Sequence, residues 1–273
     1  MNIPVSDLEK VASTARQVAA EAAELVQRMR GEARLLDSKS SATDLVTEAD
    51  QAAERLVRER LEQLRPGERV LGEELGGDTG TDGVSWVVDP IDGTVNFVHG
   101  YPHFAVSLGY QVDGVSVAGA IVEPLTGREW WAASGLGSWC DGAPLRVSAA
   151  EKLDLSLVAT GFGYTAKRRA QQAAVVTGLL SRVADIRRSG SAAVDLCSVA
   201  AGWVDAYAEH GVNRWDYAAG EIIAREAGAV TRFPDHPEDD GLGPYLTVVA
   251  APGIADALFD ALREVGAGQV TEA

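Results

Sequence analysis

Two aspartates on a stiff turn are the residues of this sequence best suited to chemistry. A short apolar run, 86–88, predicts a buried strand that delivers Asp89 and then Asp92. Pro90 holds its own φ at about −65° and keeps Asp89 extended, so both carboxylates and the Ile91 carbonyl can point toward one spot. Hard oxygen ligands gathered in this way indicate a magnesium site.

A candidate phosphate cradle follows directly. Gly93 has no side chain, so a ligand can approach its backbone closely. If the next residues start a helix, the free N–H groups of Gly93 and Thr94 face outward, where they can bind an anion. Two carboxylates beside such a cradle predict magnesium that holds a phosphate.

Other acidic positions have both a structural and a chemical interpretation. The segment Thr47–Asp50 fits a capping box that opens a helix, so Asp50 can be a simple cap. Glu73 and Glu74 follow a short predicted strand, and adjacent acids on a surface are usually solvated. Asp216 falls in the first turn of a predicted helix, where the dipole favours a carboxylate in any case. From the residues alone, capping is the better interpretation of Asp216.

Four sequence blocks, taken in order, resemble the signature of the inositol monophosphatase family. The blocks are Lys39–Asp50, Gly72–Glu74, Trp86–Phe97 and Glu209–Gly220. One short motif carries a real false-positive risk, but four in order make chance a poor explanation. The resemblance implies an α+β fold of sugar-phosphatase type, a layered α/β/α/β/α sandwich of alternating helices and mostly antiparallel sheets.

The resemblance also assigns roles to individual residues. It implies a pair of Mg²⁺ ions, with a third and weaker one, on the ligands Glu73, Asp89, the Ile91 carbonyl, Asp92 and Asp216. Asp50 and Thr94 would orient and deprotonate the attacking water, and Glu73 would also serve catalysis. Substrate contacts are implied at Asp92, Gly93, Thr94, Gly190, Ser191, Ala192, Glu209 and Asp216.

The implied reaction is hydrolysis of myo-inositol monophosphate by direct attack of a metal-activated water. Glu209 matches a position at which the family accepts hydrogen bonds from ring hydroxyls, and its carboxylate would repel a second phosphate. Arg187 and Arg188 could offset that repulsion, so fructose 1,6-bisphosphate and a 3′-phosphonucleotide stay open as substrates, as does histidinol phosphate. A non-catalytic regulatory interaction protein is the alternative from another functional class.

A glycine-rich segment offers a rival function. Gly161–Ala166 matches G-x-G-x-x-A between a predicted strand and a predicted helix, which is the dinucleotide-binding fingerprint of many oxidoreductases. The acid expected about twenty residues later would be Asp185. Asp185 opens the next predicted strand instead of closing it, and no repeated βαβ units surround the motif. A glycine-rich turn is therefore the preferred interpretation.

Charge and composition limit the classes of partner. A formal charge of −16 argues against nucleic-acid binding and against an anionic membrane surface, but not against an anionic substrate at a metal site. Cys140 and Cys197 indicate neither a disulfide framework nor a zinc site. We find no secretory signal and no membrane-length apolar run, so a cytoplasmic protein is expected. The resemblance adds a homodimer and lithium sensitivity.

Periodicity predicts the elements that must position these residues. The length suits one unit, 1–273, with an N-terminal subdomain of about 1–150 and a C-terminal subdomain of about 151–273. Apolar residues recur at helical spacing over 8–29, with a stop expected at Gly31 and a polar loop or weak hairpin over 36–46.

Further expectations concern a run of strands in the middle of the chain and a loop closer to its C-terminal end. Strands flank Asp113-Gly114, a strong hairpin signal, and Trp130, Trp131 and Trp139 should pack within the sheet that follows. The segment 231–240 is expected to be an exposed loop.

Overall fold

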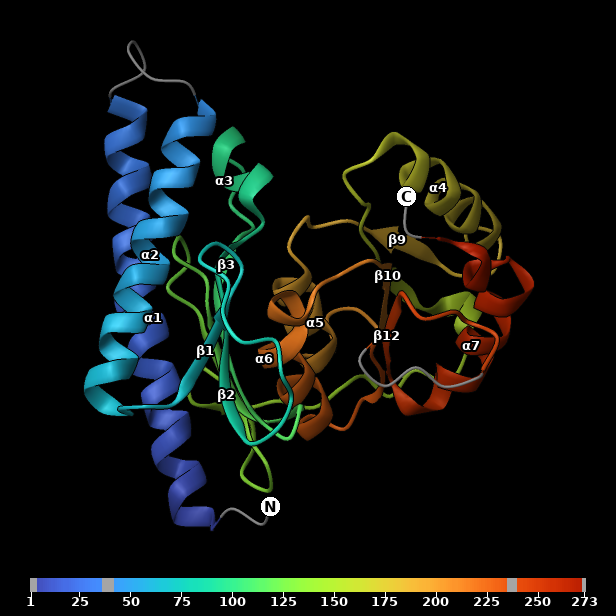
Figure 1. The fold of residues 1–273 in the computed structure, drawn as a ribbon. Helices are drawn as coiled ribbons and strands as arrows, with labels where there is room; N and C mark the ends of the chain where they lie inside the picture. Colours follow the sequence, from blue (N-terminus) through green and yellow to red (C-terminus); the bar gives the residue numbers. More distant parts are fainter. Residues whose placement is uncertain (1–3, 36–41, 235–239, 272–273) are drawn as a thin grey trace.

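The chain folds into five alternating layers of helices and sheets. The computed structural model describes residues 4–35, 42–234 and 240–271, with side chains for all of these except 31–35 and 42–47. Two helices cover the outer face of a seven-stranded sheet, two more lie between this sheet and a five-stranded sheet, and a third pair covers the far side (Figure 1). The expected layered α+β sandwich is confirmed.

The helical layers are built from six longer helices. They are α1 (Val5–Leu35) and α2 (Ala42–Leu64) in the first layer, α5 (Ala192–Ala200) and α6 (Arg214–Glu226) in the middle, and α4 (Ala166–Leu179) and α7 (Ala255–Glu264) in the last. Short 3-10 turns cover Leu153–Leu155, Pro252–Ile254 and Ala267–Gln269. Within the described residues, no helix is both long and apolar enough to span a membrane.

The first two helices correct two expected boundaries. α1 continues to Leu35, so Gly31 does not stop it. α2 begins at Ala42, so the capping box expected at Thr47–Asp50 is wrong, and so is the expected loop over 42–46. No glycine or proline interrupts 42–64, and the buried stripe that includes Ala53 packs against α1. The segment 36–41, with Lys39, lies outside the described residues.

The larger sheet runs in sequence order. Its strands are β1 (Arg69–Gly72), β2 (Val84–Asp92), β3 (Ala105–Val112), β4 (Val115–Val122), β5 (Glu129–Ala133), β6 (Gly137–Cys140) and β7 (Ala143–Pro144). Only the β1–β2 pair is parallel in this sheet. Asp113 and Gly114 have φ of 50° and 79°, as a two-residue hairpin between β3 and β4 requires, so that prediction is confirmed.

The tryptophans pack as expected. Trp130 is fully buried, and the rings of Trp131 and Trp139 stack with centroids 6.0 Å apart across the β5–β6 pair. These side chains therefore stabilise the sheet, in agreement with the sequence-based interpretation.

The smaller sheet has the order β11-β12-β10-β8-β9. Its strands are β8 (Leu157–Ala159), β9 (Asp185–Arg187), β10 (Ala206–His210), β11 (Val230–Arg232) and β12 (Leu246–Ala250). β8 pairs in parallel with β9 and β10, whereas the pairs that involve β12 are antiparallel. Arg232 and Phe233 are buried, so the expectation that 231–240 is an exposed loop is wrong over its first residues.

Helix α6 lies very close to the larger sheet. A Cβ on Gly109 would approach the Cβ of Ala218 to 2.7 Å, and one on Gly119 would approach the Cα of Ala219 to 2.8 Å. Only glycine on the strands permits this spacing, which places the first turn of α6 beside the end of β2. The middle layer thereby brings Asp216 toward Asp89 and Asp92.

Candidate active site

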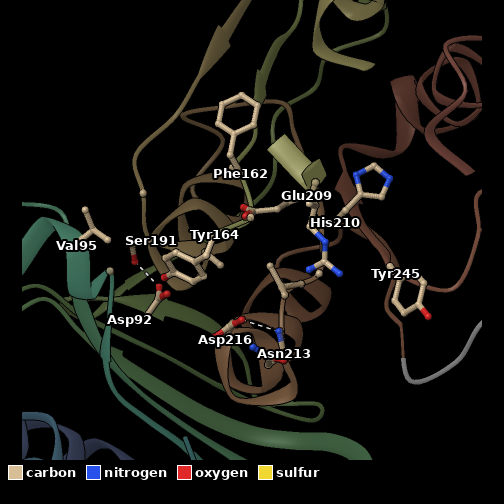
Figure 2. A pocket seen from close by; sticks show the side chains of 18 of the residues that line it. Asp92, Val95, Phe162, Tyr164, Ser191, Glu209, His210, Asn213, Asp216 and Tyr245 are labelled. Carbon is tan, nitrogen blue, oxygen red and sulfur yellow. Dashed lines mark hydrogen bonds between the residues drawn. The ribbon is translucent and has the colours of Figure 1, made fainter. Parts of the chain in front are cut away.

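Three carboxylates from distant parts of the chain meet where β2 ends. Asp89 and Asp92 belong to β2 and Asp216 to the first turn of α6, and each offers an oxygen within 4.8 Å of the others. Figure 2 shows Asp92 and Asp216 on the same side of the cavity. The sequence-based expectation that these side chains share one centre agrees with this geometry.

The local backbone of β2 explains how two aspartates on one strand reach the same place. The register of β2 against β3 shifts between Asp89 and Asp92, so Pro90 sits at an irregularity where its missing N–H is tolerated. Asp89 Oδ1 accepts a hydrogen bond from the Ile91 N–H at 3.0 Å, which fixes the turn. The strand was expected to end at 88, but it extends through both carboxylates to Asp92.

Gly93 links the strand to a short helix, α3 (Thr94–His99). Gly93 has φ of 99°, and a Cβ there would lie 3.0 Å from the carbonyl oxygen of His103. A side chain at this position would therefore be strained and crowded. The residues after Gly93 do begin a helix, which meets the condition set for an anion cradle at the N–H groups of Gly93 and Thr94.

Asp92 joins the larger sheet to helix α5 of the middle layer. Its Oδ2 accepts hydrogen bonds from the Ser191 hydroxyl and, at 2.7 Å, from the Ala193 N–H, at the start of α5 (Figure 2). Burial raises the pKa of Asp92 to about 6, although these hydrogen bonds favour the ionised form. The predicted contacts at Ser191 and Ala192 therefore lie directly beside Asp92.

Asp216 is both a helix cap and a member of the acidic group. Its Oδ2 accepts from the Asn213 N–H at 2.6 Å, and the Asn213 side chain completes a capping box. Burial, followed by the charge of Asp92, raises the pKa of Asp216 well above its usual value. The structural and chemical interpretations of Asp216 are thus compatible.

Glu73 approaches the group from the end of β1. Its N–H donates to the Val88 carbonyl at 3.2 Å, which fixes the backbone next to the acidic end of β2. The side chain is solvent-accessible but lines the cavity, and loss of hydration together with neighbouring carboxylates raises the pKa of Glu73 to about 7. A hydrogen bond with Asp89 opposes this rise.

Asp50 lies inside α2, one layer behind Glu73. The side chain is 2% exposed, and its Oδ1 has no hydrogen-bond partner among the described residues. Burial, followed by repulsion from Glu74 and Glu73, raises the pKa of Asp50 to about 8. Asp50 is therefore a buried acid without the capping role that the sequence allowed.

Thr94 lies at the start of α3, and its hydroxyl donates a hydrogen bond to the Ile91 carbonyl at 3.1 Å.

A cavity of about 310 Å³ opens above these residues. Its walls include Glu73, Asp92, Gly93, Gly190, Ser191, Ala192, Glu209 and Asp216, so most of the residues expected from the sequence line one space. Glu209, at the end of β10, accepts from the Tyr207 hydroxyl at 2.8 Å, and burial raises the pKa of Glu209 to about 7.

The glycines of the rival motif have a packing role here. A Cβ on Gly161 would lie 2.0 Å from Glu209 Oε2, and one on Gly163 would lie 2.5 Å from Cδ of Arg168. Asp185 opens β9, as expected, and forms an ion pair with Arg187 at 2.6 Å. These glycines make room for cavity side chains. This role supports a glycine-rich turn, and not a dinucleotide-binding site, as the interpretation of the motif.

The cavity-wall residues that sequence reasoning missed include Tyr164 and Arg168. The Tyr164 side chain is largely exposed but projects beside Asp92 (Figure 2), and loss of hydration, followed by the charges of Glu73 and Asp92, raises the pKa of its hydroxyl. Arg168 is the second, and a Cβ on Gly211 would lie 2.1 Å from its Nη1. Tyr164 lies within the Gly161–Ala166 motif without being singled out by it, and Arg168 belongs to no motif, although Gly163 and Gly211 make room for its side chain.

Arg187 and Arg188, the two arginines considered in the sequence, lie in different environments. Arg188 lines the cavity, but Arg187 points to Asp185 on the surface and does not line it. The side chains of Arg168 and Arg188 form no hydrogen bond or ion pair with the described residues, although each lies on the wall that also carries Glu209. The cavity wall thus carries both carboxylates and two guanidinium groups, and the charge of Arg188 acts on Glu209 and Asp195.

The donor set fits divalent cations. The carboxylates of Asp89, Asp92 and Asp216 have raised pKa values, and each offers an oxygen within 4.8 Å of the others. Carboxylate and carbonyl oxygens are the ligands that Mg²⁺ prefers, and a cation would remove the repulsion that raises these pKa values. The arrangement can therefore hold metal beside a bound anion.

Comparisons with known proteins agree with this geometry. The sequence model of the inositol monophosphatase family matches residues 7–267. An inositol-1-monophosphatase of Mycobacterium leprae is 50% identical over 96% of this chain and 97% of the relative. The solved structure of Mycobacterium tuberculosis SuhB superposes with a TM-score of 0.83 at 44% identity, over 95% of this chain and 98% of that one.

A further relative carries a different name. The Nus factor SuhB of Escherichia coli is 41% identical over 71% of this chain and 73% of the relative. The family model nevertheless spans nearly the whole sequence, and the acidic group described above lies within the matched residues. The chain therefore belongs to the inositol monophosphatase family of phosphoric monoester hydrolases.

Proposed function

We propose that this chain hydrolyses the phosphate ester of myo-inositol monophosphate with Mg²⁺ as its cofactor. The observation that carries the proposal is the group formed by Asp89, Asp92 and Asp216, of which Asp92 and Asp216 line a cavity large enough for a small phosphorylated polyol. The names of relatives that share 46–50% of its sequence support inositol monophosphate as the substrate.

The proposed donors would hold two main cations and one weaker one. Glu73, Asp89 and the Ile91 carbonyl would hold the first ion, and Asp89, Asp92 and Asp216 the second. Glu73 with waters would hold the third, weaker ion. Bound Mg²⁺ would neutralise the phosphate oxygens and lower the pKa of a coordinated water. The chain's own part is to hold these oxygens close together against their mutual repulsion.

The remaining residues bind and orient. Asp50 and Thr94 would position the attacking water, and the high pKa of Asp50 suits a group that takes up a proton near neutral pH. The N–H groups of Gly93 and Thr94 would hold the phosphate. Gly190, Ser191, Ala192 and Glu209 would contact the polyol, with Glu209 accepting hydrogen bonds from ring hydroxyls.

Release of inorganic phosphate tests the proposal. Purified protein should hydrolyse inositol monophosphate in Mg²⁺ and lose this activity in EDTA, and the ratio of kcat/KM against histidinol phosphate and a 3′-phosphonucleotide should favour the inositol ester. Asp89→Asn should abolish turnover. Near-normal activity in that variant, or equal activity in EDTA, contradicts the proposed mechanism.

A second substrate class is favoured by the two guanidinium groups on the cavity wall. The side chains of Arg168 and Arg188 form no hydrogen bond or ion pair with the described residues, so a second phosphate, as in fructose 1,6-bisphosphate, would find opposite charge there despite Glu209, on which the charge of Arg188 already acts. Arg168→Met should then reduce kcat/KM for the bisphosphate more than for the monophosphate. Lys167→Met, an exposed cation on the same turn of α4, is the matched control.

Several properties accompany the proposed function. We expect a cytoplasmic homodimer that is inhibited by lithium and built from subdomains of about 1–150 and about 151–273. We expect neither nucleic-acid nor membrane binding, since the net charge of −16 opposes both. Light scattering tests the homodimer, and activity at increasing Li⁺ concentration tests inhibition by lithium. A gel-shift assay with RNA tests a regulatory role of the kind that the Nus factor name suggests for the E. coli relative.

A further inference from the structure

A buried carboxylate outside the acidic group remains to be explained. Glu54, on α2, is 0% exposed, although glutamate is rarely buried without a specific partner. Its Oε2 accepts hydrogen bonds from the backbone N–H groups of Glu74 at 2.8 Å and Leu75 at 3.2 Å. Both donors belong to the loop that carries Glu73, so Glu54 holds this loop by its backbone.

Arg58 completes the attachment from the same helix. Its Nε and Nη2 donate to Glu54 Oε1 at 2.9 Å and 2.7 Å. The same guanidinium also donates to the carbonyl oxygens of Val70 and Gly76, on either side of the loop. The ion pair of buried Glu54 with partly exposed Arg58 therefore binds both N–H groups and carbonyl groups of the segment 70–76.

The loop itself is shaped to receive Glu54. A Cβ on Gly72 would lie 2.1 Å from Glu54 Oε1, so only glycine at this position admits the carboxylate. The Gly72 N–H donates to the Gly76 carbonyl at 3.0 Å and closes the loop, while the Glu73 N–H donates to Val88 on β2. Glu73 is thus held on one side by the strand that bears Asp89 and on the other by α2.

Helix α2 also carries Asp50 on the same face. Asp50, Glu54 and Arg58 are spaced by four residues, so they follow one another along one side of the helix. Glu74 and Glu73 are the charges that act most strongly on Asp50 after burial, which places the loop next to it. A single rigid helix therefore sets the position of Asp50 relative to Glu73.

We propose that Glu54, with Arg58, is a positioning residue that orients Glu73 for metal binding and fixes its distance from Asp50. The inference rests on the proposed metal-dependent function. Glu54 points to backbone N–H groups and to Arg58, so it acts through Glu73 and touches neither the cavity nor the substrate. Residues that orient a metal ligand in this way commonly contribute about 10–100-fold to metal affinity.

Metal titration of the purified apo protein tests the role of Glu54. Glu54→Gln keeps the shape of the side chain but replaces one acceptor oxygen with an amide that cannot serve both Arg58 and the loop N–H groups. The dissociation constant for Mg²⁺, measured by calorimetry, should rise by about 10-fold or more. The Mg²⁺ concentration that gives half-maximal activity should rise in parallel, with much of kcat recovered at saturating metal.

Arg58 and Arg60 supply a matched comparison. Both side chains lie on α2 with nearly equal exposure, 29% and 30%, and both pair with a glutamate through two nitrogens, but Arg60 pairs with Glu21 on α1, away from the loop. Arg58→Met should weaken Mg²⁺ binding, whereas Arg60→Met should reduce thermal stability without changing the metal affinity. This comparison carries the test if Glu54→Gln fails to fold.

The possible outcomes separate the two proposals. If Glu54→Gln and Arg58→Met bind Mg²⁺ as tightly as the wild-type protein, the positioning role is wrong while the proposed function stands. If Arg60→Met weakens binding as much as Arg58→Met, general destabilisation explains the effect and the positioning role is again wrong. If the wild-type protein itself binds no Mg²⁺ and shows no metal-dependent turnover, the proposed function fails.

Discussion

Replacing Asp50 by asparagine should make the metal-free protein more stable at alkaline pH while it abolishes activity. The side chain is buried in α2, one oxygen lacks a hydrogen-bond partner among the described residues, and burial raises its pKa to about 8. In the unfolded chain the same carboxyl titrates at about 4. The folded protein therefore retains a proton on Asp50 that the unfolded chain releases as the pH rises.

The size and sign of the effect follow from proton linkage. A group whose pKa is higher in the folded state contributes stability that is complete below the unfolded pKa and is lost as the pH rises through the folded pKa. Each pH unit within that window corresponds to about 1.4 kcal/mol, so between pH 5 and pH 8 Asp50 removes about 4 kcal/mol from the free energy of unfolding. An amide does not titrate and avoids this loss.

Thermal unfolding in EDTA at pH 5 and pH 8 measures the effect. The Tm difference between Asp50→Asn and wild type should grow by about 8 °C or more between the two pH values. Because the comparison is made across pH, any constant cost of the amide cancels. Asp205→Asn is the control, since Asp205 accepts hydrogen bonds from Ser148 at 2.6 Å and Leu157 at 2.7 Å and should lose stability on replacement.

Two results would refute this reasoning. A Tm difference that does not change between pH 5 and pH 8 would mean that Asp50 is not a desolvated acid with a raised pKa. Retained phosphatase activity would remove Asp50 from water activation, for which a loss of about 10²–10⁴-fold in kcat is expected. Calorimetric affinity for Mg²⁺ should stay close to that of wild type, because Asp50 is not one of the proposed ligands.

The other residues give three further predictions. Asp89→Asn should lower phosphatase turnover by more than about 100-fold and remove the Mg²⁺-dependent rise in Tm, and a Tm that still rises with Mg²⁺ would contradict the shared-ligand role. Ser191→Ala removes a hydrogen-bond donor that favours ionised Asp92, so the pKa of Asp92 should rise. The affinity for Mg²⁺ should therefore fall more at pH 6 than at pH 8, and an equal fall at both pH values would count against this account. Gly161→Ala would place a Cβ 2.0 Å from Glu209, so steady-state kinetics should show a higher KM for inositol monophosphate with a smaller change in kcat, and unchanged kinetics would mean that Glu209 does not contact the polyol.

Local sequence rules predicted much of the framework correctly. The hairpin at Asp113-Gly114, the helical start after Gly93 and the first-turn position of Asp216 depend on turn geometry, missing side chains and helix capping. These effects act between residues a few positions apart, so the sequence alone contains them. Helix ends were less certain, because α1 and α2 extend beyond their expected limits where packing outweighs a glycine or a cap.

The convergence of the acidic residues was decided by tertiary packing. Asp216 reaches Asp89 and Asp92 only because glycines on β3 and β4 let α6 lie close against the larger sheet. No local pattern contains that approach, and the four-block resemblance supplied the expectation that the structure now explains. The same holds for Arg168, whose position on the cavity wall depends on Gly211, a glycine on a distant segment of the chain.

Residue type, spacing and the stiff turn at Pro90 indicated Asp89, Asp92 and the backbone at Gly93 as candidates for binding metal and phosphate, whereas Glu73 and Asp216 were expected as ligands only from the family resemblance. Only the tertiary structure decided that Glu54 holds the loop that carries Glu73. The groups of this loop that bind Glu54 lie about twenty residues away and are backbone N–H groups, which have no sequence signature. The physical reason is that capping and turn preferences are short-range, whereas a shared metal site depends on how close whole layers of the fold can approach one another.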